Sequence, residues 1–288
     1  YANLYRQLSA TRFALSVAEG RHDEALNRLS QEMAFHIRQM QGASTLIEKL
    51  VATAHLRGDL LLLNQFIRHA PGTARQEADR LAAMLAPLPA EATQMRSVME
   101  TELRAGTLLF LSLAKQQKPA AEQPEGTGIF GLARWLDTPM KAFYLPHASA
   151  NEHFNLYRKM LASDTLSGDA YRQALATSRQ EIEAATQNTY VFYNPVGHIL
   201  VNTAAMDYSS YLLRRDDLLA LHAMVSFQLE LLRNHTNEPE AIARALDSAS
   251  LVHPYTGERP VWDKATRSLS HAAISIRSGN VKTLDIRF

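Results

Sequence analysis

Apolar residues recur at helical spacing along most of the chain. The strongest pattern runs from Tyr190 to Arg233, which begins as a loop and continues as one long helix over about 204–234. Between Leu218 and Leu232 nearly every position is apolar. A helix that is apolar on most of its circumference is buried rather than resting on a surface. We therefore expect this helix to be the central one, with the other helices packed around it.

The first part of the chain reads as a series of amphipathic helices separated by short breaks. Residues 2–19 predict a helix with one apolar face, made of Leu4, Leu8, Thr11, Leu15 and Ala18. The break at residues 20–22 resembles the turn of a tetratricopeptide repeat, but no second copy follows about 34 residues later. A short turn between two helices is therefore the preferred interpretation. Further helical stripes follow and end near Gly42, Ala70, Pro87 and Lys115.

The period changes at the C-terminal end of the sequence. Val281–Phe288 alternates, with Leu284, Ile286 and Phe288 on one side, which predicts a half-buried strand. Residues 273–277 are the expected partner strand across a tight turn, and residues 260–262 are expected to add a third short strand. These strands predict a small antiparallel meander.

The combined pattern predicts a mainly α protein. We expect a multi-helix bundle of antiparallel helices around the central helix, with a small C-terminal antiparallel β-meander. A chain of 288 residues can bury a core as one elongated domain. Residues 116–128 are rich in Gln, Pro and Glu and predict a linker or loop. The alternative is a division into an N-terminal helical half (1–116), a linker (117–128), a C-terminal helical half (129–250) and a β appendage (251–288).

Composition excludes several classes of function. The sequence has no cysteine, so disulfides, thiolate metal sites and a cysteine nucleophile are all excluded. The formal net charge is +1 with scattered basic residues, so we expect no nucleic-acid partner. The apolar runs are too short to span a bilayer. The sequence begins at Tyr1 rather than Met, which is compatible with a removed signal peptide, a membrane anchor or an artificial boundary.

No set of residues with a complete catalytic or metal-binding spacing is found. Residues 126–131 fit GxGxxG, but no strand precedes them, so we interpret them as a loop. The eleven histidines show no recognised metal-ligand spacing. His222, Ser226 and Glu230 lie at i, i+4 and i+8, which we interpret as a polar seam rather than a catalytic triad. We expect no catalytic residue, no metal and no cofactor.

The densest group of residues able to bind a ligand lies at the start of the long helical stretch. The candidate ligand-binding residues are Asn194, Gly197 and His198 in the loop, with Asp207, Tyr208, Tyr211 and Arg215 in the turns that follow. A helix start with a nearby arginine can hold an anion. The alternative is structural: Asn194 shapes a turn, Gly197 supplies freedom in φ, and Asp207 pairs with an arginine.

One segment resembles a family. Residues 253–262 read His-Pro-Tyr-Thr-Gly-Glu-Arg-Pro-Val-Trp and resemble the Asp-Pro-(Phe/Tyr)-(Ser/Thr)-Gly-(Lys/Gln)-Pro-Leu segment of many uncharacterised, exported bacterial proteins. A Ser-x-Gly strand then follows in those proteins, as at 275–279 here, and residues 45–54 are similar to one of their helices. His253 stands where Asp is usual, and Arg259-Pro260-Val261 stands where Lys-Pro-Leu is common. The resemblance implies an exported helical body with one N-terminal membrane anchor, and no catalytic residue.

The sequence thus predicts a non-enzymatic, extracytoplasmic binding or scaffold domain of a bacterial cell-envelope protein. We expect it in the periplasm, anchored to the inner membrane by a segment before Tyr1, with an envelope protein or a small ligand as partner. Two alternatives stay open. One is a hydrolase of envelope material, with His198 or His222 as base and Asp207 or Glu230 assisting. The other is a small-molecule sensor whose pocket is lined by Tyr190, Tyr193, Tyr208 and Tyr211.

Overall fold

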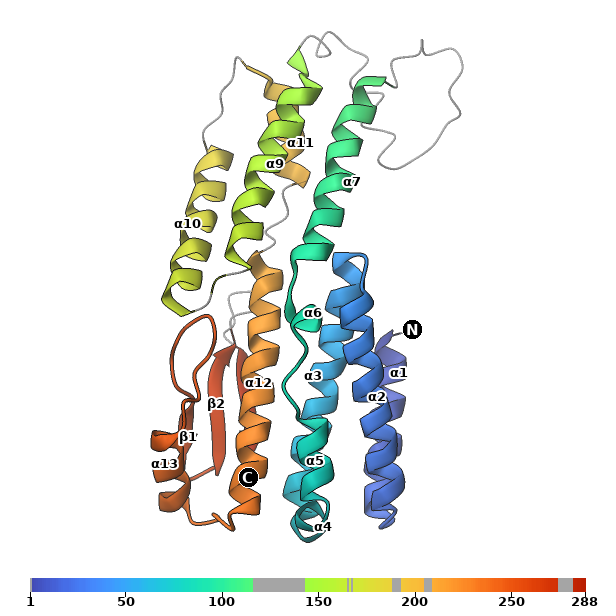
Figure 1. The fold of residues 1–288 in the computed structure, drawn as a ribbon, viewed down its shortest axis with the longest axis vertical. Coiled ribbons are helices and arrows are strands. Elements are labelled where there is room, and N and C mark those ends of the chain that lie inside the picture. The colour runs from blue at the N-terminus through green and yellow to red at the C-terminus, as the bar shows by residue number, and fades with distance from the viewer. Residues whose placement is uncertain are drawn as a thin grey trace. The chain divides into compact units, whose positions relative to one another are not determined.

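The computed structural model describes residues 2–115, 143–164, 166, 168–187, 193–204, 209–273 and 282–288. The fold is mainly α with a small antiparallel sheet near the C-terminal end, as predicted (Figure 1). The chain divides into two compact units, residues 1–94 with 210–288, and residues 95–209. The first unit therefore combines both ends of the chain, a grouping that differs from the halves suggested by the sequence.

The first unit contains most of the helices. They are α1 (Ala2–Ala18), α2 (His22–Gly42), α3 (Leu46–His69), α4 (Pro71–Gln76), α5 (Ala78–Met84), α6 (Ala90–Thr93), α12 (Ser209–Arg233) and α13 (Pro239–Ser248). Local chemistry sets their ends. Thr45 and Glu48 form a capping box at the start of α3, in which each side chain accepts from the other's backbone N–H. Pro71 then begins α4, where the missing N–H costs nothing.

The sheet belongs to the core of the first unit. Its strands β1 (Val261–Asp263), β2 (Ser268–Ala273) and β3 (Lys282–Arg287) pair antiparallel in sequence order. Leu269 lies opposite Ile286, and both side chains are fully buried. The last strand and the short strand after Pro260 are confirmed. The strand that pairs with β3 is β2, which ends at Ala273. The predicted partner, residues 273–277, therefore overlaps β2 only at Ala273, and residues 274–281 lie outside the described residues.

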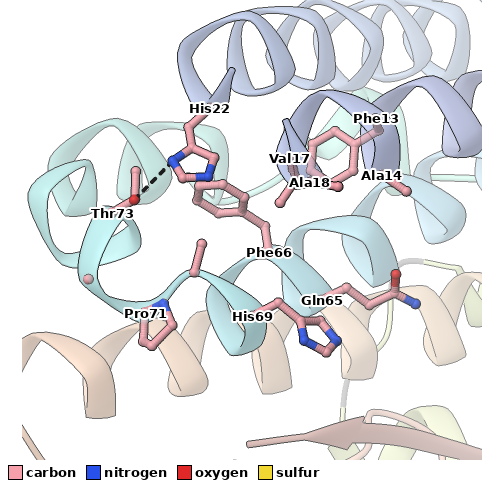
Figure 2. A pocket seen from close by; sticks show the side chains of 12 residues that line it. Phe13, Ala14, Val17, Ala18, His22, Gln65, Phe66, His69, Pro71 and Thr73 are labelled. Atoms are coloured by element: carbon pink, nitrogen blue, oxygen red, sulfur yellow. Dashed lines mark hydrogen bonds between the residues drawn. The ribbon is translucent and has the colours of Figure 1, made fainter. Parts of the chain in front are cut away.

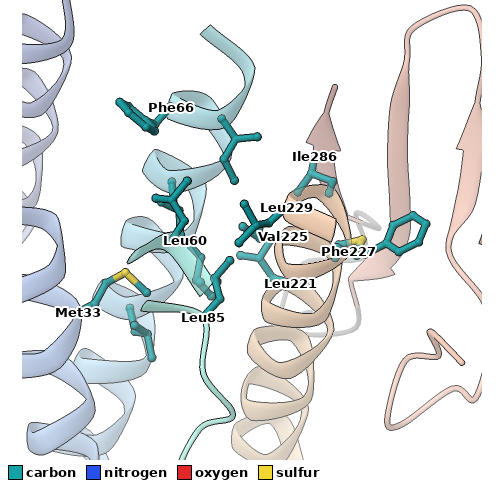
Figure 3. Close-up of a cluster of buried hydrophobic side chains, with 14 of the residues drawn as sticks. Met33, Leu60, Phe66, Leu85, Leu221, Val225, Phe227, Leu229 and Ile286 are labelled. Atoms are coloured by element: carbon teal, nitrogen blue, oxygen red, sulfur yellow. The ribbon is translucent and has the colours of Figure 1, made fainter. Parts of the chain in front are cut away.

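Helix α12 is buried between α3 and the sheet (Figures 1 and 3). Leu221, Val225 and Leu229 point toward Leu60 of α3, while Phe227 points toward the strands (Figure 3). All five side chains are at most 5% exposed. Burial of such a side chain contributes about 1.5–3 kcal/mol. The predicted burial of this helix is confirmed, and α3 contributes equally to the same core.

Helix α1 packs with a different face from the predicted one. Leu4, Leu8 and Leu15 are 57%, 57% and 53% exposed, whereas Phe13 is only 5% exposed. Phe13 contacts Phe66 of α3 edge to face, with ring centroids 6.3 Å apart. The prediction that the leucine stripe, with Thr11 and Ala18, is the inward face was wrong. One aromatic side chain at a helix crossing fills more space than the leucines, and it orients the helix.

The second unit contains α7 (Arg96–Lys115), α9 (Pro146–Ser163), α10 (Gly168–Gln187) and α11 (Pro195–Ala204). Asp164 caps the start of α7, because its Oδ2 accepts from the backbone N–H groups of Met95 and Arg96 at 2.8 and 2.9 Å. Tyr144 Oη donates to the Phe110 carbonyl at 2.6 Å and ties the segment before α9 to α7. The predicted linker and the GxGxxG segment lie outside the described residues. Among the helices of the described part, none has the length and apolarity to cross a membrane.

Candidate functional site

The predicted site lies at the start of α11. The prediction that Gly197 and His198 belong to a loop was wrong, because both are helical and only Asn194 precedes the helix. Asn194 is 4% exposed and has a φ of 56°, in the left-handed region that asparagine tolerates. Its Oδ1 accepts from the Leu145 backbone N–H at 2.7 Å, and its Nδ2 donates to Ser149 Oγ at 3.0 Å. The first bond satisfies the backbone N–H of Leu145, the residue before α9, and in the second Ser149 Oγ of α9 accepts from the Asn194 amide. Asn194 therefore joins two helices and has little capacity left for a ligand.

Gly197 has a packing role. A Cβ at this position would lie 2.0 Å from Ser149 Oγ and 2.2 Å from Asn194 Nδ2. Its φ is not positive, in contrast to Gly20, Gly168 and Gly257. The expectation that Gly197 supplies freedom in φ was wrong. The position requires glycine because α9 approaches the backbone of α11 closely.

His198 is held by two neighbouring side chains. Its Nδ1 lies 2.6 Å from Glu152 Oε1, and its Nε2 lies 2.9 Å from Asn202 Nδ2. With Glu152 ionised, Nδ1 carries the proton and donates to the carboxylate, and Nε2 accepts from the Asn202 amide. Both ring nitrogens are then engaged, so no lone pair is free to remove a proton from a substrate. The carboxylate beside His198 comes from α9, a partner 46 residues away in sequence.

The remaining predicted residues fall elsewhere. Asp207 and Tyr208 lie outside the described residues, as does Tyr190. Tyr211 and Arg215 lie on α12 in the first unit, whereas Asn194, Gly197 and His198 lie in the second. The Arg214 guanidinium lies 5.5 Å above the Tyr211 ring, and Arg215 Nε donates to Asp216 Oδ1 at 3.0 Å. The side chains of both predicted residues therefore contact neighbours on their own helix.

The polar seam of α12 is not a catalytic relay. Ser226 Oγ donates to the His222 backbone carbonyl at 2.9 Å, one turn earlier in the same helix. Burial lowers the pKa of His222, and the Glu230 side chain is exposed. The hydroxyl is used inside the helix and the carboxylate faces solvent, so the three side chains do not act together. The structural interpretation of this seam holds.

Two further histidine clusters are buried in the first unit, and neither was anticipated. His36 Nδ1 lies 2.7 Å from Asp59 Oδ2, and His36 Nε2 lies 3.3 Å from His55 Nδ1. Burial raises the pKa of Asp59 and, together with the neighbouring imidazole of His36, lowers that of His55. These residues come from α2 and α3 at positions where the sequence shows only single polar residues within apolar stripes.

The second cluster lies around His253, in the turn before β1. His253 Nδ1 accepts from the backbone N–H groups of Tyr255 and Thr256 at 3.2 and 3.4 Å, as an aspartate does in an Asx-turn. Its Nε2 then donates to buried Asp217 Oδ1 at 3.2 Å. His271 lies beside it, with ring centroids 5.5 Å apart, and burial lowers the pKa of His271 to about 4. His253 therefore closes this turn and also ties it to α12.

A largely apolar cavity opens where α1, α2, α3 and α4 meet (Figure 2). We call it the α1–α4 groove. It has a volume of about 590 Å³ and is lined by Phe13, Ala14, Val17, Ala18, His22, Gln65, Phe66, His69, Ala70, Pro71, Gly72 and Thr73. Figure 2 shows side chains of α1 and of the α3–α4 junction arranged around Phe66. His22 Nδ1 and Thr73 Oγ1 lie 3.0 Å apart, which places two polar groups at the end of an apolar floor.

From the sequence alone, this region is recognised only as two breaks between helices. The groove is built from two helix breaks, at Gly20–His22 and at Ala70–Pro71, which lie about fifty residues apart in the chain. Each break predicts the end of a helix, and neither predicts that the two ends meet. The useful signal was the apolar content beside each break, namely Val17 before the first and Phe66 before the second.

Comparison with known proteins gives no relative. No family model, no curated protein and no solved structure matches the chain. In the described part of the chain, no group of three or more His, Cys, Asp or Glu residues is arranged to hold a metal ion.

Proposed function

We propose that this chain is a non-enzymatic binding domain of a bacterial cell-envelope protein, and that its first unit holds a small amphiphilic molecule in the α1–α4 groove. The observation that carries this proposal is the groove itself. Its volume of about 590 Å³ lies in the range of small-molecule sites, which are mostly apolar with a few placed polar groups.

The floor of the groove suits an apolar body. Phe13 and Phe66 are 5% and 1% exposed, so they form a fixed base, and the surface open to a ligand comes mainly from Ala14, Val17 and Ala18 above them. Val17 and Pro71 add apolar surface from opposite helices. A preformed floor costs little conformational entropy when a ligand binds. An alkyl chain or one or two fused rings would cover this surface.

The polar end suits a single headgroup that forms hydrogen bonds. His22 and Thr73 bond to each other, and each keeps further capacity: Thr73 Oγ1 has a second lone pair, and the imidazole has a second nitrogen. His22 also contacts Phe66 edge to face at 5.8 Å, which orients the imidazole over the floor. A hydroxyl, amide or carboxyl headgroup could bond here. The envelope location rests on the resemblance of residues 253–262 and is part of the proposal.

A groove-filling variant tests the proposal. Ala18 lines the groove and is exposed, so Ala18→Trp fills the cavity without disturbing the core. Ala54 is exposed on α3 away from the groove, which makes Ala54→Trp a matched control. We expect the neutral apolar dye N-phenyl-1-naphthylamine to bind the wild-type protein and Ala54→Trp equally, and to bind Ala18→Trp at least about 10-fold more weakly in fluorescence titrations. Equal binding by all three proteins would refute the proposal.

The headgroup is identified by competition. Decanol, decanoate and decanamide share a chain and differ at one end, and each is titrated against the bound dye. We expect Thr73→Val, which keeps the shape and removes the hydroxyl, to weaken the favoured competitor by about 10-fold while leaving the dye unaffected. If Thr73→Val weakens the dye and every competitor alike, the polar end plays no part in recognition.

The hydrolase alternative rests on the Glu152–His198 pair, whose imidazole is 13% exposed. His198 Nδ1 and Glu152 Oε1 lie 2.6 Å apart, the distance of a strong hydrogen bond between a histidine and a carboxylate. Asn202 occupies the second nitrogen, and this favours a structural role. Hydrolysis of p-nitrophenyl acetate by the wild-type protein and by His198→Gln separates the two functions. A rate above that of free imidazole that is lost in the variant would favour the hydrolase.

A further inference from the structure

A second cavity of the first unit differs in chemistry from the groove. It has a volume of about 270 Å³ and lies where α3, α4 and the end of α12 meet α13 and the sheet. Three arginines from separate segments line it: Arg68 from α3, Arg75 from α4 and Arg267 from the turn before β2. Ile242 and Phe288 contribute apolar surface. We call it the arginine pocket.

The arginines have few partners within the protein. No Asp or Glu is among the described residues that line the pocket. Within the described part of the chain, Arg68 and Arg75 form no ion pair, and Arg75 Nε is buried without a hydrogen-bond partner. Arg267 donates one bond, from Nη2 to the Asn237 carbonyl at 3.0 Å. A buried guanidinium N–H without an acceptor is costly, and like charges around one cavity repel.

Helix dipoles account for part of this arrangement. Arg68 and Arg75 lie in the last turns of α3 and α4, where a cation is favoured. That effect explains each position separately. It does not explain why both side chains line one cavity with Arg267, which lies on no helix, or why a donor is buried without an acceptor. A bound anion would offset the repulsion among the three guanidinium groups.

The walls limit the size and the character of the anion. Gln228 is fixed, because its Oε1 accepts from Asn64 and its Nε2 donates to the Arg287 carbonyl, at 2.8 and 3.0 Å. Phe288 packs edge to face on Trp262 at 5.3 Å, so its ring is also held. A rigid pocket of this volume accepts one ring or a short chain. Its apolar wall favours an organic anion over an inorganic one.

We propose that the arginine pocket binds a small organic anion, namely a carboxylate or a phosphate monoester with an apolar body. The anionic group lies among Arg68, Arg75 and Arg267, and the body lies against Ile242 and Phe288. The planar guanidinium group matches the geometry of both anions, because it can donate two parallel hydrogen bonds to either. The proposal does not depend on the ligand of the α1–α4 groove. Among the described lining residues, the two cavities share only Pro71.

Calorimetric titration with matched probes tests this site. Benzoate and phenyl phosphate share one ring and differ in the anion, benzamide is the neutral analogue of benzoate, and inorganic phosphate lacks the ring. At about 20 mM salt, where charges are weakly screened, we expect one of the two ring-bearing anions to bind with a Kd below about 1 mM. The comparison of benzoate with phenyl phosphate identifies the favoured anion. We expect benzamide and inorganic phosphate each to bind at least about 10-fold more weakly.

Variants assign the binding to the pocket. Arg68 is exposed, so Arg68→Met keeps the fold, and Arg75→Met removes the guanidinium with the buried donor. Arg38→Met, at an exposed position of α2 outside the pocket, is the matched control. We expect each pocket variant to weaken the favoured anion at least about 10-fold and Arg38→Met to leave it unchanged. Arg75→Met without ligand should melt at or above the wild-type temperature, because one repelling charge is removed.

Several results would overturn the proposal. They are the absence of heat from both ring-bearing anions up to about 10 mM, equal binding of benzamide, and equal binding by Arg68→Met and the wild-type protein. If Arg75→Met fails to fold, the exposed variant Arg68→Met decides the question. A negative result at the arginine pocket does not bear on ligand binding in the α1–α4 groove, because the dye titration uses variants at other residues and a neutral probe.

Discussion

Gly106 of α7 is the position where the packing of the second unit makes the sharpest prediction. Alanine is favoured over glycine inside a helix by about 0.5–1 kcal/mol, so propensity alone predicts that Gly106→Ala stabilises the protein. A Cβ at this position, however, would lie 2.4 Å from His153 Cε1 and 2.8 Å from His153 Nε2. Optimal contact between carbon atoms is about 3.5–4.0 Å, so the ring or the helix must move.

The ring of His153 has little room to move. It is 1% exposed and lies 5.2 Å from the Phe110 ring and 4.6 Å from the Tyr157 ring, measured between centroids. Insertion of a methyl group into a packed core costs about 1–3 kcal/mol. After subtraction of the helix-propensity gain, we expect Gly106→Ala to lower the free energy of unfolding by about 0.5–2 kcal/mol.

Without the His153 ring, Gly106→Ala is expected to stabilise the protein rather than destabilise it. In a His153→Ala background the contact is absent, so Gly106→Ala should raise the free energy of unfolding by about 0.5–1 kcal/mol. The matched control is Gly58→Ala in the interior of α3, where a Cβ meets only the flexible side chain of Arg6, at 3.3 Å. We expect that variant to be neutral or stabilising.

Urea unfolding, with hydrogen exchange at the amides of α7 and α9, measures these changes in the second unit. A double-mutant cycle then gives the coupling between Gly106 and His153, which should be about 1–3 kcal/mol. A clash between a Cβ at position 106 and the His153 ring is refuted if Gly106→Ala stabilises the protein while His153 is present, or if the cycle shows no coupling. It is also refuted if Gly58→Ala costs as much as Gly106→Ala.

Three further outcomes follow from buried contacts. Gly197→Ala should lower the free energy of unfolding by about 1–3 kcal/mol, because its Cβ would lie 2.0 Å from Ser149 Oγ; an unchanged melting temperature would contradict the close approach. Burial lowers the pKa of His271 from 6.5 to about 4, so the unfolded chain takes up the proton first as pH falls. The contribution of neutral His271 to the free energy of unfolding is therefore fully present above pH 6.5 and is lost as the pH falls toward 4. We expect the free energy of unfolding to fall by about 2 kcal/mol between pH 7 and 4.5. Urea unfolding of His271→Leu should show a smaller fall over the same pH range. Asp59→Ala should cost about 3 kcal/mol by leaving His36 buried without its acceptor, and Asp59→Asn, which keeps an oxygen, should cost clearly less. Equal losses in the two Asp59 variants would mean that the hydrogen bond to His36 contributes little.

Much of the secondary structure could be predicted because its signals are local. The apolar stripes of the helices recur every three or four residues, and the alternation at Leu284 and Ile286 spans two. Contacts over such separations depend only on the geometry of one element. Local patterns failed where two faces of one helix could both be buried. On α1 the leucine stripe is the more regular, but Phe13 faces the core.

The candidate site could be predicted only in part, for a related reason. Asn194, Gly197 and His198 do come together, and their neighbours are Ser149 and Glu152, more than forty residues earlier. The sequence pattern could not identify these partners, so it could not show that the polar groups satisfy one another. A polar residue that looks free to bind a ligand in a sequence is often already paired in the fold.

Composition and local periodicity are sufficient to establish the helical class, the C-terminal meander, the burial of α12 and the lack of any cysteine chemistry. Each of these follows from composition or from spacing within one element. The buried face of α1, the need for glycine at position 197 and the places where cavities form depend on contacts between elements that are distant in sequence. The α1–α4 groove joins two helix breaks, and the arginine pocket joins three distant segments. Cavities are properties of how elements pack, and packing depends on side-chain shapes across the whole unit rather than on the period of any one segment.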